Sequence, residues 1–227
     1  MATVATRVAT TSHLGFTLRK VTWDLYCQLR DEPANDRVRM DYLDGTLTLM
    51  SPAIRHERRS EVLGLLVRGV TNGLGLEVTS LRSTTLRRED DHPSGGVGKE
   101  PDNAFYFGEN ERRMRKKVDL DLDVDPPPDL AIEVDSTNDS RPSLPIYARL
   151  GIPEVWRYDV SAHNLWFGRL VDGHYETIER SVNLPRLTPA LVLHALDVLD
   201  DGEMGENAWF EWLKGWAREL PEVPATA

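Results

Sequence analysis

The sequence predicts a mixed α/β (α+β) fold with an N-terminal hairpin and a C-terminal helix. Apolar and polar residues alternate over 38–50 around Asp44-Gly45, a dipeptide typical of a two-residue hairpin turn. An amphipathic helix is expected over 54–70, and an apolar strand at 129–135. Strands and helices that follow one another along 227 residues favour one domain, built on a mixed sheet that helices flank.

Further elements are expected in the first half of the chain. Thr22 is typical of an N-cap, and it precedes a short helix with Trp23 and Tyr26 at helical spacing. Ser51-Pro52 should end the second strand of the hairpin, because proline cannot continue a ladder. Beyond the long helix, we expect one or two strands at 76–87, a glycine-rich loop at 93–98 and a short strand at 104–107.

The second half begins with a charged excursion at 109–127 that ends in three prolines and for which no packed element is predicted. After the strand at 129–135, a helix at 143–150 should close at Gly151, since glycine is the commonest helix terminator. The remaining expected elements are a strand at 153–160, a second hairpin at 164–180 that turns at Asp172-Gly173, and a helix at 207–220.

We expect three parts along the chain: a flexible segment at 1–19, the main domain at 20–198, and a helical extension at 199–227. The last helix carries Trp209, Phe210, Leu213 and Trp216, spaced three or four residues apart. This spacing indicates either a core-facing stripe or a contact between two copies of the chain, so a homodimer is one interpretation of it.

Composition excludes several classes of protein. Apolar residues make up 40% of the chain and charged residues 28%, which is ordinary for a globular domain with a real core. No apolar run approaches the roughly 18 residues that a membrane helix needs, and the N-terminus lacks the apolar core of a secretory signal. Cys27 is the single cysteine, which excludes an internal disulfide framework and fits a cytoplasmic location.

The charge is unevenly distributed. The net charge of −10 argues at first against a nucleic-acid partner, because polyanion binding uses basic surfaces. Residues 119–139, however, hold eight acidic side chains and no basic ones, and the tail at 186–227 is acidic as well. DNA binding therefore stays open, and we expect any such binding to be metal-dependent, local and weakened by salt. Basic residues cluster at Arg55, Arg58 and Arg59, at Arg82, Arg87 and Arg88, and at Arg112, Arg113, Arg115, Lys116 and Lys117.

Carboxylates stand beside two apolar strands. Asp102 follows a proline and opens the strand at 104–107, while Glu133 and Asp135 share one face of the strand at 129–135. Buried carboxylates are costly unless they are paired, protonated or bound to metal. If they meet, they form a hard oxygen site that suits Mg²⁺ or Mn²⁺. Alternatively, Asp102 caps a turn and Glu133 makes a structural ion pair.

The order of these motifs resembles the PD-(D/E)XK nuclease superfamily, and more closely the Uma-two (Uma2) family of restriction-endonuclease-like proteins. The resemblance covers about residues 20–195. Its motifs are Tyr42-Leu-Asp44-Gly45, Met50-Ser51-Pro52 with His56, Glu100-Pro101-Asp102, Pro127-Pro128-Asp129-Leu-Ala-Ile-Glu133-Val134, Ile146-Tyr147-Ala148 and Gly151-Ile-Pro153-Glu154-Val-Trp156-Arg-Tyr-Asp159.

This resemblance implies a restriction-endonuclease-like fold, a metal-dependent endonuclease activity on DNA, and Asp102 and Glu133 as ligands of Mg²⁺ or Mn²⁺. It suggests His56 or its neighbour Glu57 as a further site residue. Asp41 matches a position where the family usually carries an acidic residue before the Asp-Gly turn.

The chain departs from the family at the lysine that should stabilise developing charge or orient the attacking water. The basic superfamily pattern puts it two residues after the glutamate, where this chain has Asp135, which could instead add a third carboxylate. The Uma-two pattern often puts it four residues before the matched tyrosine, where this chain has Ser143. Arg141 and Lys99 are the candidate substitutes, although the geometry of arginine differs from that of lysine.

Three functional hypotheses follow. The first is a metal-dependent endonuclease that hydrolyses phosphodiesters in DNA. The second is a catalytically degenerate nuclease fold that binds nucleic acid or a protein partner without cleavage, as the serine at position 143 suggests. The third ignores the resemblance and treats the carboxylates as the acid/base pair of another hydrolase, such as a glycosidase.

Overall fold

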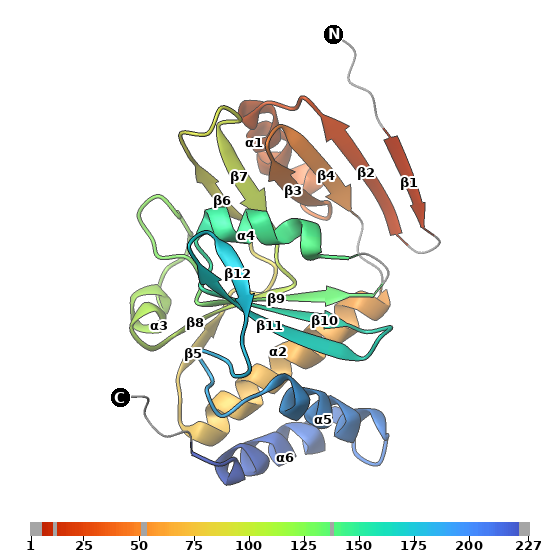
Figure 1. The fold of residues 1–227 in the computed structure, drawn as a ribbon, viewed down its shortest axis with the longest axis vertical. Helices are drawn as coiled ribbons and strands as arrows, with labels where there is room; N and C mark the ends of the chain where they lie inside the picture. Colours follow the sequence, from red (N-terminus) through yellow and green to blue (C-terminus); the bar gives the residue numbers. More distant parts are fainter. Residues whose placement is uncertain (1–5, 11–12, 51–53, 137–138, 223–227) are drawn as a thin grey trace.

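The computed structural model describes residues 6–10, 13–50, 54–136 and 139–222, and the side chains of these residues from 15 onward except those of 54–56. The described residues form two six-stranded sheets and six α-helices (Figure 1). The mixed α+β class expected from the sequence is confirmed.

The first sheet is antiparallel, with the strand order β1-β2-β4-β3-β7-β6. The predicted hairpin lies at its centre, and Asp44 and Gly45 adopt positive φ angles of 50° and 72°, as a two-residue turn requires. Its strands are β1 (Thr6–Thr10), β2 (His13–Arg19), β3 (Arg39–Leu43), β4 (Thr46–Met50), β6 (Leu86–Glu89) and β7 (Gly96–Lys99).

The segment at 1–19, expected to be flexible, contains two of these strands. β2 pairs with β4 along Gly15–Met50 to Arg19–Thr46, and β1 pairs with β2. The pairing partner lies about thirty residues away in the sequence, so local pattern alone does not reveal it. The division of the chain into three parts stays a prediction.

The second sheet has the order β12-β11-β10-β9-β8-β5, and within it only β9 and β10 run parallel. The second hairpin turns at Asp172-Gly173 as predicted. Parallel neighbours need a crossover connection, which here is a helix. The strands are β5 (Val78–Ser80), β8 (Asn103–Phe107), β9 (Leu130–Asp135), β10 (Glu154–Asp159), β11 (Asn164–Val171) and β12 (His174–Thr177).

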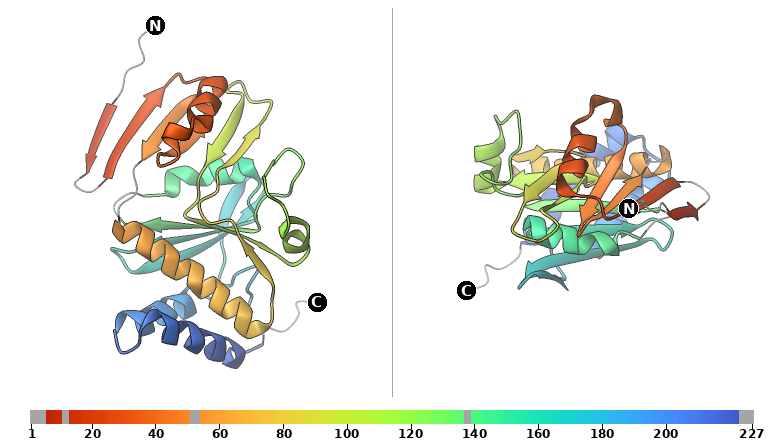
Figure 2. Two further views of the ribbon diagram at one scale, coloured as in Figure 1. Left: turned by 180° about the vertical axis from the view of Figure 1, so that it is seen from behind. Right: turned by 90° about the horizontal axis from the view of Figure 1, so that it is seen from above.

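Helices separate and cover the sheets (Figures 1 and 2). α4 is the crossover between β9 and β10 and lies between the two sheets, while α2 crosses the opposite face of the second sheet. α5 and α6 pack outside α2. The helices are α1 (Trp23–Asp31), α2 (Ile54–Leu74), α3 (Gly108–Met114), α4 (Leu144–Leu150), α5 (Pro189–Asp200) and α6 (Glu206–Glu219), with single 3-10 turns η1 (Pro33–Asn35) and η2 (Arg141–Ser143).

The aromatic stripe of the last helix faces the core of its own chain. Trp209 and Leu213 are fully buried, and they belong to one apolar cluster with Leu66 and Val70 of α2. The Trp209 indole also donates a hydrogen bond to the Ala195 carbonyl of α5, 2.7 Å away. Intramolecular packing therefore accounts for this part of the pattern without a second copy.

Two helices were not predicted. α3 falls in the excursion at 109–127, where its buried Glu111 accepts two hydrogen bonds from Arg115 and one from Thr79. The sequence pattern did not reveal this helix, because one of its two buried residues is a glutamate and the helix therefore lacks an apolar stripe. α5 begins at Pro189 after the Thr188 N-cap, a start signal that the sequence does contain.

The predicted loop at 93–98 is partly wrong, because Gly96–Lys99 forms β7 in the interior of the first sheet. Glycine is rare in strands, yet here it makes room for aromatic rings of α1. A Cβ at Gly96 would lie 2.8 Å from the Trp23 ring, and one at Gly98 would lie 2.1 Å from the Tyr26 hydroxyl oxygen. The glycines of β7 are therefore explained by the aromatic rings that pack against this strand.

Gly98→Ala should destabilise the fold by about 1–3 kcal/mol, the usual cost of overpacking a core. The reason is the clash of the new methyl group with the fully buried Tyr26. The measurement is the free energy of unfolding in urea. Gly215→Ala in α6 is the matched control, since nothing lies within 4 Å of its added Cβ and alanine favours helix. Equal stabilities of the two variants would contradict the packing argument.

Candidate active site

The chain passes from the first sheet to the second between Lys99, the last residue of β7, and Asn103, the first residue of β8. Two cross-strand pairs flank this crossing. Tyr42 pairs with Gly98 in the antiparallel β3–β7 ladder, so the next position sets Asp41 opposite Lys99. Asn103 pairs with Ile132 in the antiparallel β8–β9 ladder, so the position before it sets Asp102 opposite Glu133. Residues directly opposite in a ladder share a face, which brings these four side chains to one place.

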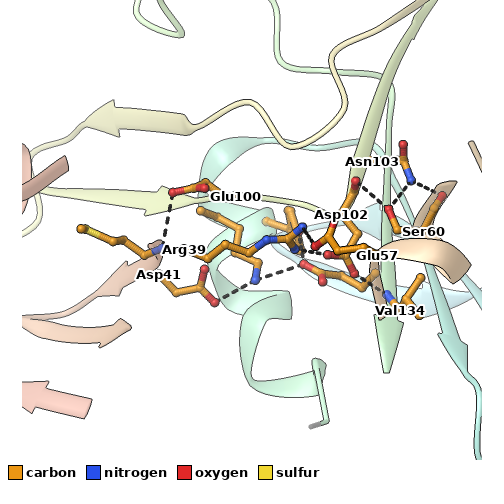
Figure 3. Close-up of polar contacts among 12 residues, drawn as sticks. Arg39, Asp41, Glu57, Ser60, Glu100, Asp102, Asn103 and Val134 are labelled. Atoms are coloured by element: carbon orange, nitrogen blue, oxygen red, sulfur yellow. Dashed lines mark hydrogen bonds and ion pairs between the residues drawn. The ribbon is translucent and has the colours of Figure 1, made fainter. Parts of the chain in front are cut away.

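Asp102 is held by the neighbouring strand and by α2. Its Oδ2 accepts a hydrogen bond from the Val134 backbone N–H at 2.8 Å, and its carbonyl oxygen accepts one from the Ser60 hydroxyl at 3.1 Å (Figure 3). Its Oδ1 accepts a hydrogen bond from Nη1 of Arg39. The side chain is almost completely buried, so it depends on these partners.

Glu133 is equally buried and faces α4. Its Oε1 lies 3.1 Å from Nζ of Lys99 and accepts a hydrogen bond from the Tyr147 hydroxyl. Burial raises the pKa of Glu133 to about 7, although the Lys99 ammonium acts in the opposite direction. The carboxyl therefore changes its protonation state near neutral pH.

Lys99 stays protonated in this setting. Its Nζ donates a hydrogen bond to Oδ2 of Asp41 at 2.7 Å and also contacts Glu133. Burial alone would lower the pKa of Lys99, but these two carboxylates raise it above its ordinary value. The result is a fixed positive charge beside the two facing carboxylates of Asp102 and Glu133.

Arg39 closes the site on the side of α2. It lies two residues before Asp41 on β3, so both side chains share one face of the sheet. Its guanidinium joins Asp102 to Glu57, whose Oε1 lies 3.0 Å from Nη2, as Figure 3 shows. Arg39 is 13% exposed and Glu57 is 51% exposed, so this bridge lies at the boundary with solvent.

A second buried ion pair holds the segment between Lys99 and Asp102 in place. Nη1 of Arg30 lies 2.7 Å from Oε1 of Glu100, and both side chains are 8% exposed. The same oxygen accepts a weak hydrogen bond from the Met40 N–H at 3.4 Å. This pair ties α1 and β3 to the residue that follows Lys99.

The donor set fits a hard divalent cation. Asp102 and Glu133 offer only oxygen, and Mg²⁺ is commonly held by one or two carboxylates with water completing its coordination. Oδ1 of Asp41 is a buried oxygen without a hydrogen-bond partner among the described residues, which adds to the negative potential. Among all the residues that the structure describes, no group of three or more His, Cys, Asp and Glu side chains is placed to hold a metal ion.

The other residues predicted for the site lie around it. Asp135 is on the same face as Glu133 but pairs with Arg157 at 2.5 Å and accepts a hydrogen bond from the Ser140 N–H at 2.9 Å. Together with Arg157 and Trp166 it lines a hollow of about 390 Å³ at the ends of β9 and β10. The side chain of His56 lies outside the described residues, although its backbone belongs to the first turn of α2.

The two candidate cations differ in where they lie. Arg141 is 74% exposed, and its Nε pairs with Asp139 at 2.7 Å, so the contacts described for it lead away from Glu133. Lys99 contacts Glu133 directly. Ser143 is buried one helical turn before Tyr147.

Sequence reasoning missed the contact of Arg39 with Asp102. A signal existed, since Arg39 and Asp41 alternate on the strand that leads into the predicted turn and thus share a face. Nothing in the sequence shows that this face lies against Asp102, because that contact joins two sheets.

A family model, Uma2, described as a putative restriction endonuclease, matches residues 23–200. The chain belongs to the Uma2 family. The matched range contains both cross-strand pairs and Tyr147. No curated protein matches the chain. None of the helices in the described part of the chain has the length and apolar character needed to cross a membrane.

Glu133→Gln should change how stability depends on pH in the metal-free protein. Because the folded-state pKa of Glu133 is about 7 and its ordinary value is 4.5, the folded protein binds the extra proton between these values. Its contribution to stability is therefore lost as the pH rises through this window, at up to about 1.4 kcal/mol per pH unit.

The variant should remove that part of the slope when the free energy of unfolding is measured from pH 4.5 to 8 in EDTA. Glu211→Gln is the matched control, because Glu211 is 68% exposed and lies on α6. A slope that Glu133→Gln leaves as steep as in the control would refute a neutral-range titration of Glu133.

Proposed function

We propose that this Uma2-family protein is a Mg²⁺- or Mn²⁺-dependent endonuclease that hydrolyses phosphodiester bonds in DNA. One observation carries the proposal: the Lys99 ammonium lies 3.1 Å from Glu133, which faces Asp102 across the β8–β9 ladder. Two facing carboxylates and one lysine are the donor set that the resemblance to PD-(D/E)XK nucleases implies. Here the lysine comes from another strand in another sheet.

Asp102 and Glu133 would hold the cation. When bound there, the cation would supply positive charge that polarises a phosphodiester oxygen. The Val134 N–H and the Ser60 hydroxyl fix Asp102, so its carboxylate is oriented before any ligand arrives. Tyr147 and Lys99 fix Glu133 in the same way.

The reaction is an exchange of oxygen atoms at phosphorus. The oxygen of water forms a bond to phosphorus, a P–O ester bond breaks, and the leaving oxygen gains the proton that water loses. Lys99 keeps its protons, so it acts as a hydrogen-bond donor and positive charge toward the attacking water or a phosphate oxygen. Asp41 holds the ammonium in place from the opposite side.

We assign supporting roles to the neighbouring residues. Asp135 anchors Arg157 next to the end of β9, which keeps an arginine near Glu133 without adding a ligand. DNA binding is consistent with the uneven charge of the chain, and a homodimer stays a prediction.

The alternative, a degenerate fold that binds without cleavage, is favoured by one contact. Arg39 already accompanies Asp102 in the structure, and a permanent guanidinium there would oppose a divalent cation. Metal affinity therefore decides between the two functions.

Asp102→Asn should abolish divalent-cation-dependent cleavage of plasmid and oligonucleotide DNA, because it removes a charged ligand. The assay compares product formation with Mg²⁺, Mn²⁺ and EDTA. Glu154→Gln is the matched control: Glu154 is a fully buried carboxylate of the same sheet whose partners are Trp156 and Asn183, outside the site. The proposal fails if the unaltered protein leaves DNA equally intact in all three conditions.

Lys99→Met should lower the single-turnover cleavage rate by about 10²–10³, the scale for losing an electrostatic contributor to the transition state. Ser143→Lys added to this variant should recover part of the rate, because position 143 precedes Tyr147 by one helical turn. Lys117→Met is the control for the loss of a lysine elsewhere. It breaks the ion pair between Lys117 and Asp125 in the loop that follows α3. An undiminished rate in Lys99→Met would contradict the assignment.

A further inference from the structure

We propose that Arg39 is a phosphate ligand that rests on Asp102 and Glu57 until a divalent cation binds, and then contacts the substrate phosphodiester. This inference deepens the proposed nuclease function and rests on it. In this proposal Arg39 competes with the cation for Asp102 and also attracts the phosphates of DNA.

The backbone of Arg39 lies inside the first sheet, and its guanidinium lies at the boundary with solvent. β3 lies between β4 and β7 in the first sheet, so its backbone is held on both sides. The guanidinium contacts Asp102 on the buried side and Glu57 on the exposed side. Glu57 belongs to the first turn of α2, and more than half of its side chain is exposed. The bridge thus ends at the solvent boundary, where a polymeric substrate must approach.

Charge explains why the resting contact and a bound cation compete. Asp102 is a proposed ligand of the cation, and Arg39 is hydrogen-bonded to the same carboxylate. A guanidinium and a divalent cation that share one carboxylate repel each other, because both are positively charged. Cation binding therefore weakens the contact between Arg39 and Asp102, while Glu57 remains as the outer partner.

The released guanidinium suits a phosphate. Arginine presents planar donors that match phosphate oxygens in a bidentate manner, whereas Lys99 is a buried point charge committed to Asp41 and Glu133. The two basic residues therefore divide the work: Lys99 stays with the reacting centre, and Arg39 lies at its rim. In the described part of the chain, Arg39 is the arginine that contacts Asp102.

The experiment measures two affinities of opposite expected sign. Calorimetry gives the Kd for Mn²⁺, and fluorescence anisotropy gives the Kd for a labelled DNA duplex in Ca²⁺, under conditions checked to give no cleavage. Arg39→Met should tighten Mn²⁺ binding about tenfold and weaken DNA binding about tenfold, each tenfold change corresponding to about 1.4 kcal/mol. Arg39→Lys, which keeps the charge but loses the planar donors, should leave Mn²⁺ affinity near that of the unaltered protein and still weaken DNA binding.

Arg186→Met is the control. It also removes a partly buried arginine from a carboxylate, but its partner Glu222 follows α6 and lies outside the site, so neither affinity should change. Circular dichroism verifies the fold of each variant. Weakening of both affinities in Arg39→Met, no change in either, or tighter Mn²⁺ binding with unchanged DNA binding would each overturn the inference.

The proposed function fails in a distinguishable way. If the unaltered protein and Arg39→Met both bind no Mn²⁺ by calorimetry, the metal site itself is absent and the inference falls with it. If instead Asp102→Asn loses the Mn²⁺ binding that the unaltered protein shows, the site stands and the two Arg39 affinities decide the inference alone.

Discussion

The buried charges at the crossing between the two sheets constrain the rest of this structure. Lys99 and Asp102 lie three residues apart, yet each lies at the end of an interior strand of a different sheet, and both are almost fully buried. Charged groups are tolerated there only because each has a partner: Asp41 and Glu133 for Lys99, Arg39 for Asp102. The two sheets cannot slide or separate without exposing unpaired charges, so the site also sets how the layers meet.

If the cluster is the proposed nuclease site, its lysine has changed its place in the sequence but still contacts the glutamate. Such a lysine has to reach the glutamate, and the strand or helix that carries it can differ. In this chain Lys99 ends β7, whose glycines pack closely against Tyr26 and Trp23. β7 belongs to the first sheet and Glu133 to the second, so the lysine contacts the glutamate from the other sheet. Under the proposed function, position 143 then no longer has to carry a cation, because the Lys99 ammonium already contacts Glu133.

The sequence predicted the elements whose signals are local. Both Asp-Gly hairpins, the amphipathic α2, the apolar β9 and the Gly151 stop of α4 follow from turn chemistry and periodicity. β7 was not predicted, because its glycines make sense only once the aromatic rings that pack on them are known. For the site, Asp102 and Glu133 lie opposite each other in one ladder, while their role as metal ligands stays a prediction. The contact of Arg39 with Asp102 and that of Lys99 with Glu133 depend on how two sheets meet, which local sequence patterns do not reveal.

The opposition of Asp41 and Lys99 across β3 and β7 has a consequence for how relatives of this chain can diverge. An acidic residue at 41 without a lysine at 99 would be an unpaired buried charge, and the reverse holds equally. A lineage that returns the lysine to position 143 is released from both requirements together. Positions 41, 99 and 143 should therefore change as a linked set during evolution, and the glycine at 98 should be retained only where an aromatic ring still occupies position 26.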